Sequence, residues 1–173
     1  HHFFDLNMFP PFIEKKKYDI LIYGNCNKRI YPIRYFLKKL FQRKKYRFKI
    51  IESNHYKLES DSIIGKELYK EINNSYITLA TTGKYKFFTK KYQEIPLSGS
   101  MIFGTIPENY KDIYNSENII VLSNLNDETI IKTIDEHLEK KDLLLEKIKN
   151  FQKVIRKKFC MENAYLELKK IIE

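Results

Sequence analysis

A glutamate follows a cluster of positive charge in the middle of the chain. Lys90, Lys91 and Tyr92 come shortly before Glu94, and an Ile-Pro pair and a glycine follow it. Lysine ammonium groups attract phosphate, and an ionised carboxylate can accept hydrogen bonds from two hydroxyls of one ribose. This stretch therefore suggests a nucleotide site, with the lysines beside phosphate and the carboxylate beside the sugar. The same pattern also fits a solvated helix end that Gly99 caps.

The elements around this stretch alternate between strands and helices. Short apolar or β-branched runs predict strands at residues 18–25, 47–52, 76–80, 101–103 and 118–122. Apolar residues at helical spacing predict helices that start at Pro32 and Asn126, and over residues 63–73, 87–94, 141–158 and 162–172. In the helix at 63–73, Ile64, Leu68 and Ile72 are expected to face the core. The alternation is typical of an α/β, Rossmann-like doubly wound parallel sheet, here with C-terminal helices.

Ligands of open α/β sheets bind beyond the carboxyl ends of the strands, where the residues after the first predicted strand lie. Gly24 allows the backbone to approach a ligand closely, and Asn25 follows it. Arg29 and Arg34 flank the start of a helix, and a helix N-terminus already favours anions. We therefore expect these four residues to contact a nucleotide. A surface arginine in a salt bridge is the alternative for Arg34.

A second loop at residues 81–89 runs into a predicted helix and contains one glycine. Its free backbone N–H groups can hold a diphosphate, with Lys86, Phe88 and Thr89 as further candidate contacts. The loop is neither a P-loop nor a dinucleotide-binding turn, because the spaced glycines of both motifs are absent.

Two motifs resemble glycosyltransferases of the GT-B class, specifically the spore-maturation-protein-like branch of the group 1/family 4 type. The signature of that branch is a basic residue, an aromatic, a glutamate, Ile-Pro and a following glycine. The segment from Lys91 to Gly99 is similar, with one extra residue between Tyr92 and Glu94. If Gln93 takes the aromatic position instead, the spacing is kept and the aromatic is lost. Tyr31-Pro32-Ile33-Arg34 is similar to the Tyr-Pro-x-Arg motif of the same family, and the two motifs occur in the same order.

The resemblance implies that the chain is the C-terminal, donor-binding half of a hexosyltransferase. Residues 1–17 would be an interdomain linker, because Asp5 and Phe9-Pro10-Pro11 are similar to the segment before the first strand in that family. Residues 18–173 would bind a nucleotide sugar, such as a UDP or GDP sugar, and end in a helical hairpin. An N-terminal domain outside this chain would bind a glycan, protein or lipid acceptor. No catalytic residue is therefore assigned.

One position departs from the family pattern. Many relatives have two glutamates in an E-x(7)-E arrangement, the first at the donor sugar and the second at the ribose. Glu94 matches the second position, whereas Lys86 occupies the first. The ribose contact therefore carries over and the sugar contact does not. Related enzymes work without a metal held by an Asp-x-Asp motif, and that motif is absent here, so we expect neither a metal nor a cofactor.

The composition leaves two alternatives open. The net charge of +10 over 173 residues favours anionic partners. A basic module that binds nucleic acid is one alternative, but its lysine and arginine clusters at residues 15–17, 38–39 and 43–45 are spread along the chain. A non-catalytic interaction domain is the other. No apolar run reaches membrane-spanning length, and two distant cysteines favour a reducing, cytoplasmic compartment.

Overall fold

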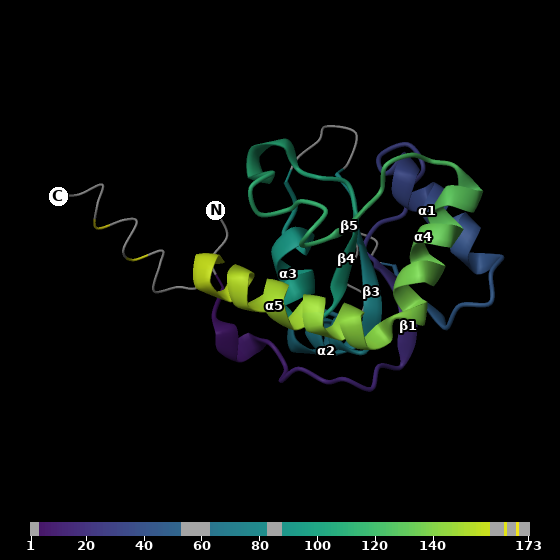
Figure 1. Cartoon of the computed structure of the whole chain (residues 1–173). Coiled ribbons are helices and arrows are strands. Elements are labelled where there is room, and N and C mark those ends of the chain that lie inside the picture. The colour runs from purple at the N-terminus through teal and green to yellow at the C-terminus, as the bar shows by residue number, and fades with distance from the viewer. Residues whose placement is uncertain (1–3, 53–62, 83–87, 160–164, 166–168, 170–173) are drawn as a thin grey trace.

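The computed structural model describes residues 4–52, 63–82, 88–159, 165 and 169. This part of the chain forms one parallel sheet of five strands in the order β2-β1-β3-β4-β5 (Figure 1). The strands are β1 (Tyr18–Tyr23), β2 (Phe48–Ile51), β3 (Ser75–Ala80), β4 (Met101–Gly104) and β5 (Ile120–Val121). After β2 the chain returns to the other side of β1 to form β3. The strand order therefore reverses between β1 and β3, where α/β sheets open a crevice for ligands.

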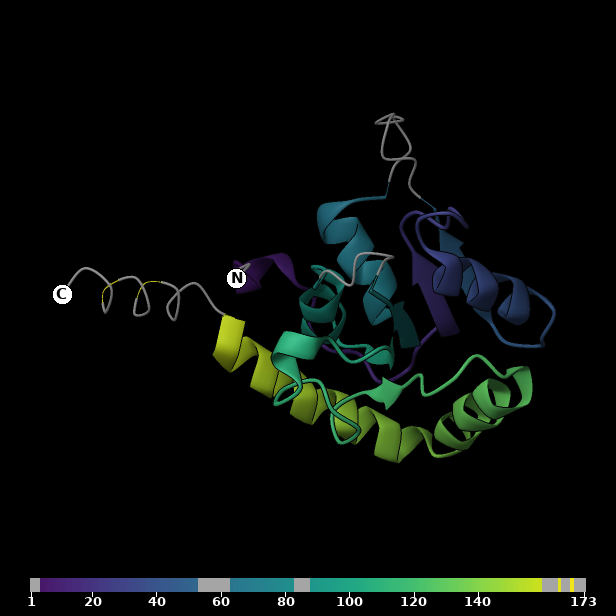
Figure 2. The ribbon, with the colours of Figure 1, turned by 90° about the horizontal axis from the view of Figure 1, so that it is seen from above.

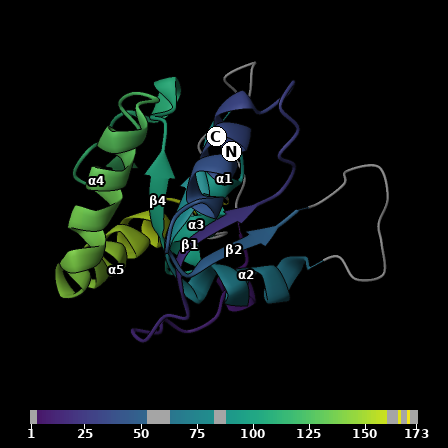
Figure 3. The ribbon, with the colours of Figure 1, turned by 90° about the vertical axis from the view of Figure 1, so that its right-hand side faces the viewer.

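Helices cover both faces of this sheet. They are α1 (Pro32–Gln42), α2 (Gly65–Asn73), α3 (Lys91–Leu97), α4 (Asp127–Glu139) and α5 (Lys141–Phe159), with short 3-10 turns η1 (Leu6–Met8) and η2 (Glu108–Tyr110). Buried residues of α1 and α4 pack on one face, and those of α2 and α3 pack on the other. Figure 3 accordingly shows α4 and α2 on opposite sides of the strands. The face that carries α2 and α3 is the one that builds the candidate site.

Helix α5 joins the two halves of the core. Leu144 and Ile148 near its start belong to the apolar cluster under α1 and α4, whereas Phe151 and Ile155 belong to the cluster under α2 and α3. Viewed from above, α5 runs from beside α4 to the N-terminal segment (Figure 2). None of the helices in the described part of the chain is both long and apolar enough to cross a membrane.

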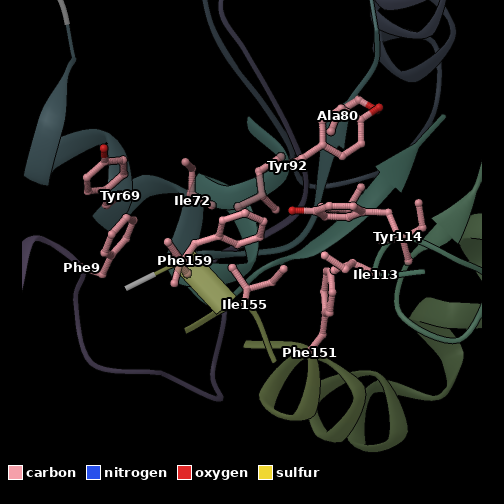
Figure 4. Packing of buried hydrophobic residues seen from close by; sticks show 14 of the residues in the cluster. Phe9, Tyr69, Ile72, Ala80, Tyr92, Ile113, Tyr114, Phe151, Ile155 and Phe159 are labelled. Carbon is pink, nitrogen blue, oxygen red and sulfur yellow. The ribbon is translucent and has the colours of Figure 1, made fainter. Parts of the chain in front are cut away.

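The N-terminal segment packs on the domain beside α2. The ring of Phe9 stacks on Tyr69 of α2 with 4.4 Å between ring centroids, and Figure 4 shows the two rings side by side. The backbone N–H of Phe4 donates to the carbonyl oxygen of Phe159 at 3.2 Å. The N-terminal segment thus packs against the rest of the domain, and its assignment as an interdomain linker stays a prediction.

The structure confirms the predicted α/β parallel sheet and most of its elements, and it corrects three details. Helix α3 begins at Lys91 and passes through Pro96 to Leu97, whereas the prediction ended it at Glu94. Pro96 removes one backbone hydrogen bond, and the helix still closes through Ser100 N–H to Ile95 O at 3.1 Å and through Gly99 at a φ of +86°. Glu94 therefore lies in the first turn of α3 and not at its end.

The other two corrections concern Ile64 and β5. Ile64 precedes α2 and is 60% exposed, so it does not face the core as predicted, whereas Ile72 is fully buried. Strand β5 has only two residues, because Asn118 is held in a turn by its N–H bond to Asn115 O. Most of the helix predicted at 162–172 lies outside the described residues, as do residues 53–62 between β2 and α2.

Lys16 is buried at the amino ends of the strands, opposite the predicted ligand side. Its Nζ donates hydrogen bonds to the backbone carbonyl oxygens of Asn73 at 2.7 Å and Gly99 at 2.8 Å. The ring of Phe12 lies 4.7 Å from the same nitrogen. Burial lowers the pKa of Lys16 to about 7, because the ammonium loses its hydration. This lysine therefore ties the start of β1 to the end of α2 and to the turn before β4.

We expect Lys16 to make the free energy of unfolding rise with pH above neutrality. The unfolded chain keeps this lysine protonated up to about pH 10.4, whereas the folded chain releases the proton near pH 7. The unfolded state then binds more protons in this window, so stability increases by on the order of 2 kcal/mol between about pH 7 and 9. Urea unfolding at both pH values measures the increase. Lys16→Met should make the increase smaller by the contribution of Lys16 and leave the contributions of Lys91 and Lys147, whose pKa values are also lowered. The exposed Lys15→Met should keep the full increase; the same increase in both variants would contradict the assignment.

Candidate functional site

A cavity of about 300 Å³ opens at the carboxyl ends of β1 and β2, between the start of α1 and helices α2 and α3. Its lining combines an apolar wall from β2 and α2 with charged groups from α1 and α3. The lining residues are Tyr23, Gly24, Asn25, Tyr31, Arg34, Ile51, Ile63, Ile64, Leu68, Thr89, Lys90, Lys91 and Glu94. The cavity therefore lies next to the point where the strand order reverses.

Arg34 supplies a buried positive charge to this cavity. Pro32 fixes the first position of α1, which places Arg34 in the first turn of the helix, and the side chain is only 2% exposed. Its Nη1 donates to the carbonyl oxygen of Asn25 at 2.6 Å, and the guanidinium carbon lies 4.2 Å from the centroid of the Tyr31 ring. The buried Nε has no hydrogen-bond partner within the described residues. Arg34 is thus held in place by neutral groups and keeps donor capacity.

Lys91 brings a second cation to the same end of β1. Its ammonium lies 3.3 Å from the centroid of the Tyr23 ring and donates a hydrogen bond to the Tyr23 carbonyl oxygen. Burial and, second, the positive charge of Arg34 hold the pKa of Lys91 well below its usual value. The described residues supply no carboxylate to either cation within salt-bridge distance. An anion in the cavity would therefore relieve an unfavourable concentration of positive charge.

Gly24 is the point at which both cations approach the backbone. A Cβ atom at this position would lie 3.1 Å from Lys91 Nζ and 3.6 Å from Arg34 Nη1. The residue also has a φ of +85°, a conformation that side chains disfavour. A glycine at the end of β1 therefore keeps the space between the two cations open to a ligand.

Glu94 brings a carboxylate into the cavity from the first turn of α3. The Tyr23 hydroxyl donates to Oε2 at 3.0 Å, and the Tyr69 hydroxyl approaches Oε1 at 3.5 Å. The carboxylate is half-buried, and each of its oxygens has further lone pairs available to a ligand. The cavity thus combines an acceptor for hydroxyl groups with two donors for an anion.

The structure brings together most of the residues that the sequence predicts for the site. Seven of them line the cavity, namely Gly24, Asn25, Arg34, Thr89, Lys90, Lys91 and Glu94. Arg29 is exposed and does not line it, because it lies in the turn before α1. Lys86 lies outside the described residues.

Tyr92 lies in the core, the partly buried Phe88 packs against it, and neither lines the cavity. Their rings stack with 5.5 Å between centroids, and Tyr92 is fully buried. The Tyr92 hydroxyl donates to the carbonyl oxygen of Thr105 at 2.7 Å, which ties α3 to the end of β4. Tyr92 therefore has a structural environment on the face of α3 opposite Lys91 and Glu94.

Sequence reasoning did not include Tyr23, Tyr69 or the apolar wall of the cavity. Tyr23 is the last residue of β1 and shares a sheet face with the buried Leu21, so the period of two places it under α3. Its position at a strand's carboxyl end is a signal that could have identified it. Tyr69 reaches the site through the packing of α2 on α3, which the sequence does not specify.

The described residues contain no group of three or more His, Cys, Asp or Glu side chains that could hold a metal ion. The polar groups that do converge here are two basic side chains and tyrosine hydroxyls, which donate hydrogen bonds, and a single carboxylate, which accepts them. This set suits an organic anion that carries hydroxyl groups.

Comparisons with known proteins identify the fold. No protein-family model and no curated protein matches the sequence. Among solved structures, the sucrose-phosphate synthase of Thermosynechococcus elongatus is similar, with a TM-score of 0.73 and 12% sequence identity. The match covers 99% of this chain and 50% of that chain, so this chain spans about half of its length.

Sucrose-phosphate synthase is a GT-B glycosyltransferase, and the similarity shows that this chain has the Rossmann-like fold of a GT-B domain. The predicted fold class is confirmed. At 12% identity the likeness concerns the fold alone, so the spore-maturation-protein-like branch stays a prediction.

Proposed function

We propose that this chain is a glycosyltransferase domain that binds a nucleoside-diphosphate sugar donor in the cavity at the end of β1. The observation that carries the proposal is the pairing of a buried arginine, Arg34, and a half-buried lysine, Lys91, with one carboxylate, Glu94, in a single cavity. The cations lack a carboxylate partner among the described residues, which favours an anionic ligand.

The chemistry of the lining suits the three parts of a nucleotide. Arg34 and Lys91 flank Gly24 and would bind the diphosphate, with the unpartnered Nε of Arg34 as an additional donor. Glu94 would accept the ribose hydroxyls. The apolar wall of Ile51 and Leu68 gives a base a surface to pack against.

The same cations would assist the transfer step. When the bond between the sugar and the diphosphate breaks, negative charge increases on the leaving phosphate oxygens. Fixed cations with little access to water stabilise such charge more strongly than water does. The acceptor, whether a glycan, a protein or a lipid, would bind in a part of the enzyme that this chain, at half the length of its structural relative, does not supply.

A nucleotide screen tests the proposal. We expect at least one of UDP, GDP and ADP, or a sugar conjugate of these, to raise the melting temperature of the chain. A ligand at a hundred times its dissociation constant adds about 2.7 kcal/mol of stability, which is readily visible as a shift. Duplex DNA at equal phosphate concentration serves as the control, because a general basic surface would bind it equally well. If DNA raised the melting temperature and no diphosphate did, the proposal would be wrong and a nucleic-acid-binding function would take its place.

A further inference from the structure

Tyr23 contacts both charged groups of α3 that line the cavity. Its hydroxyl donates to Glu94 Oε2 at 3.0 Å, while its ring face lies 3.3 Å from Lys91 Nζ and its carbonyl oxygen accepts from the same ammonium. The side chain is 5% exposed and comes from the end of a central strand. One rigid residue therefore sets the positions of the carboxylate and the ammonium relative to each other.

We propose that Tyr23 is a positioning residue that orients the Glu94 carboxylate toward the ligand and so makes the site selective for a nucleotide with free 2′- and 3′-hydroxyls. The proposal rests on the proposed function and adds a residue and a specificity to it. Tyr69 gives weaker support from the other side, at 3.5 Å from Oε1, and is itself held by the stacked ring of Phe9.

The physical reason lies in the freedom of a glutamate side chain. A free carboxylate on a flexible stem would lose rotamer freedom each time it bound a diol. The Tyr23 hydroxyl holds one carboxylate oxygen before the ligand arrives, so the side chain of Glu94 has already lost this rotamer freedom in the free protein and ligand binding does not cost it again. An ionised carboxylate that already accepts from a phenol can only accept further hydrogen bonds. The ligand must then supply the donors, and a vicinal diol supplies two.

Both phenols stay protonated under ordinary conditions, as a donor role requires. Burial and then the charge of Glu94 raise the pKa of Tyr23 well above its usual value. The same causes, burial first, raise the pKa of Tyr69 to about 12. Both hydroxyls therefore keep the proton that they donate over the range of pH in which nucleotide binding is measured.

Tyr23→Phe isolates this role, because it removes only the hydroxyl and keeps the ring and carbonyl that contact Lys91. The probes are whichever of UDP, GDP and ADP binds the wild-type chain most tightly, and the 2′,3′-dideoxy form of that nucleotide. We expect the variant to bind the ribonucleotide about tenfold more weakly and the dideoxy form nearly unchanged, so the ratio of the two dissociation constants moves toward one. In a Glu94→Ala background, Tyr23→Phe should have no further effect on that ratio.

Tyr46→Phe provides a matched control. The Tyr46 hydroxyl donates to Asp135 Oδ1 at 2.7 Å, on the opposite face of the sheet, so this variant loses a bond of the same kind without touching the cavity. It should leave both dissociation constants unchanged.

Equal losses of affinity for the ribonucleotide and the dideoxy form in Tyr23→Phe would assign Tyr23 a structural role and overturn the inference. An unchanged ratio in Tyr23→Phe, with a lost preference in Glu94→Ala, would overturn it and leave the proposed function standing. A wild-type chain that binds no nucleoside diphosphate would overturn both.

Discussion

Replacing Glu94 by alanine is expected to lower the affinity for a nucleoside diphosphate by about two orders of magnitude or more. The carboxylate enters the cavity from the first turn of α3 with lone pairs still available on both oxygens. If it accepts two ribose hydroxyls, the variant loses two charge-assisted hydrogen bonds, each contributing about 1.5–3 kcal/mol. About 1.4 kcal/mol corresponds to a tenfold change in dissociation constant, so the combined loss is large. Isothermal titration calorimetry of both proteins measures it.

The 2′,3′-dideoxy nucleotide separates this contact from a general disturbance of the site. It lacks both hydroxyls, so it should bind the wild-type chain weakly and lose little further affinity in Glu94→Ala. Glu117→Ala removes the same charge from an exposed position and should change neither dissociation constant. Comparable losses for the normal and dideoxy ligands would mean that Glu94 shapes the cavity without contacting ribose.

The sequence was sufficient to predict the sheet because each strand is a short run of mainly apolar or β-branched residues that can be recognised without knowledge of its neighbours. β3 is apolar or β-branched along almost its whole length and is buried at every residue, as a central parallel strand requires. Pro32 marked the start of α1 for an equally local reason, since proline suits the first helical turn. The end of α3 was predicted wrongly because a proline usually stops a helix, and here the Gly99 turn compensates for the bond that Pro96 cannot make.

The candidate site was only partly predictable, because side-chain direction depends on where each element begins and on what packs against it. Arg29 and Arg34 are both basic residues near the start of α1, yet only Arg34 turns inward, since it lies within the helix while Arg29 precedes it. Lys91 and Tyr92 are adjacent on α3, and their side chains lie on different faces of that helix. The contribution of Tyr69 arises from the packing of α2 beside α3, which no local pattern encodes.

Arg34→Met is expected to separate stability from ligand binding more clearly than any other change in the cavity. In the free protein the guanidinium is buried, its hydrogen bond and ring contact are to neutral groups, and burial lowers the pKa of Arg34. An apolar side chain of similar length removes that desolvation cost and loses one hydrogen bond to the Asn25 carbonyl oxygen. The free energy of unfolding should therefore change by less than about 1 kcal/mol or increase.

Diphosphate affinity should respond in the opposite way in the same variant. Arg34 can offer a phosphate more than one charge-assisted hydrogen bond, so its loss should weaken binding by about a hundredfold or more. Urea unfolding and calorimetric titration, performed on one preparation, measure both quantities. Arg29→Met removes the same charge from an exposed residue that does not line the cavity. Because water and salt screen a surface charge, this variant should alter the dissociation constant of the diphosphate by less than about threefold. Strong destabilisation of Arg34→Met with unchanged diphosphate affinity would make Arg34 a structural residue, and the cavity would then lose the cation on which the proposed donor site depends.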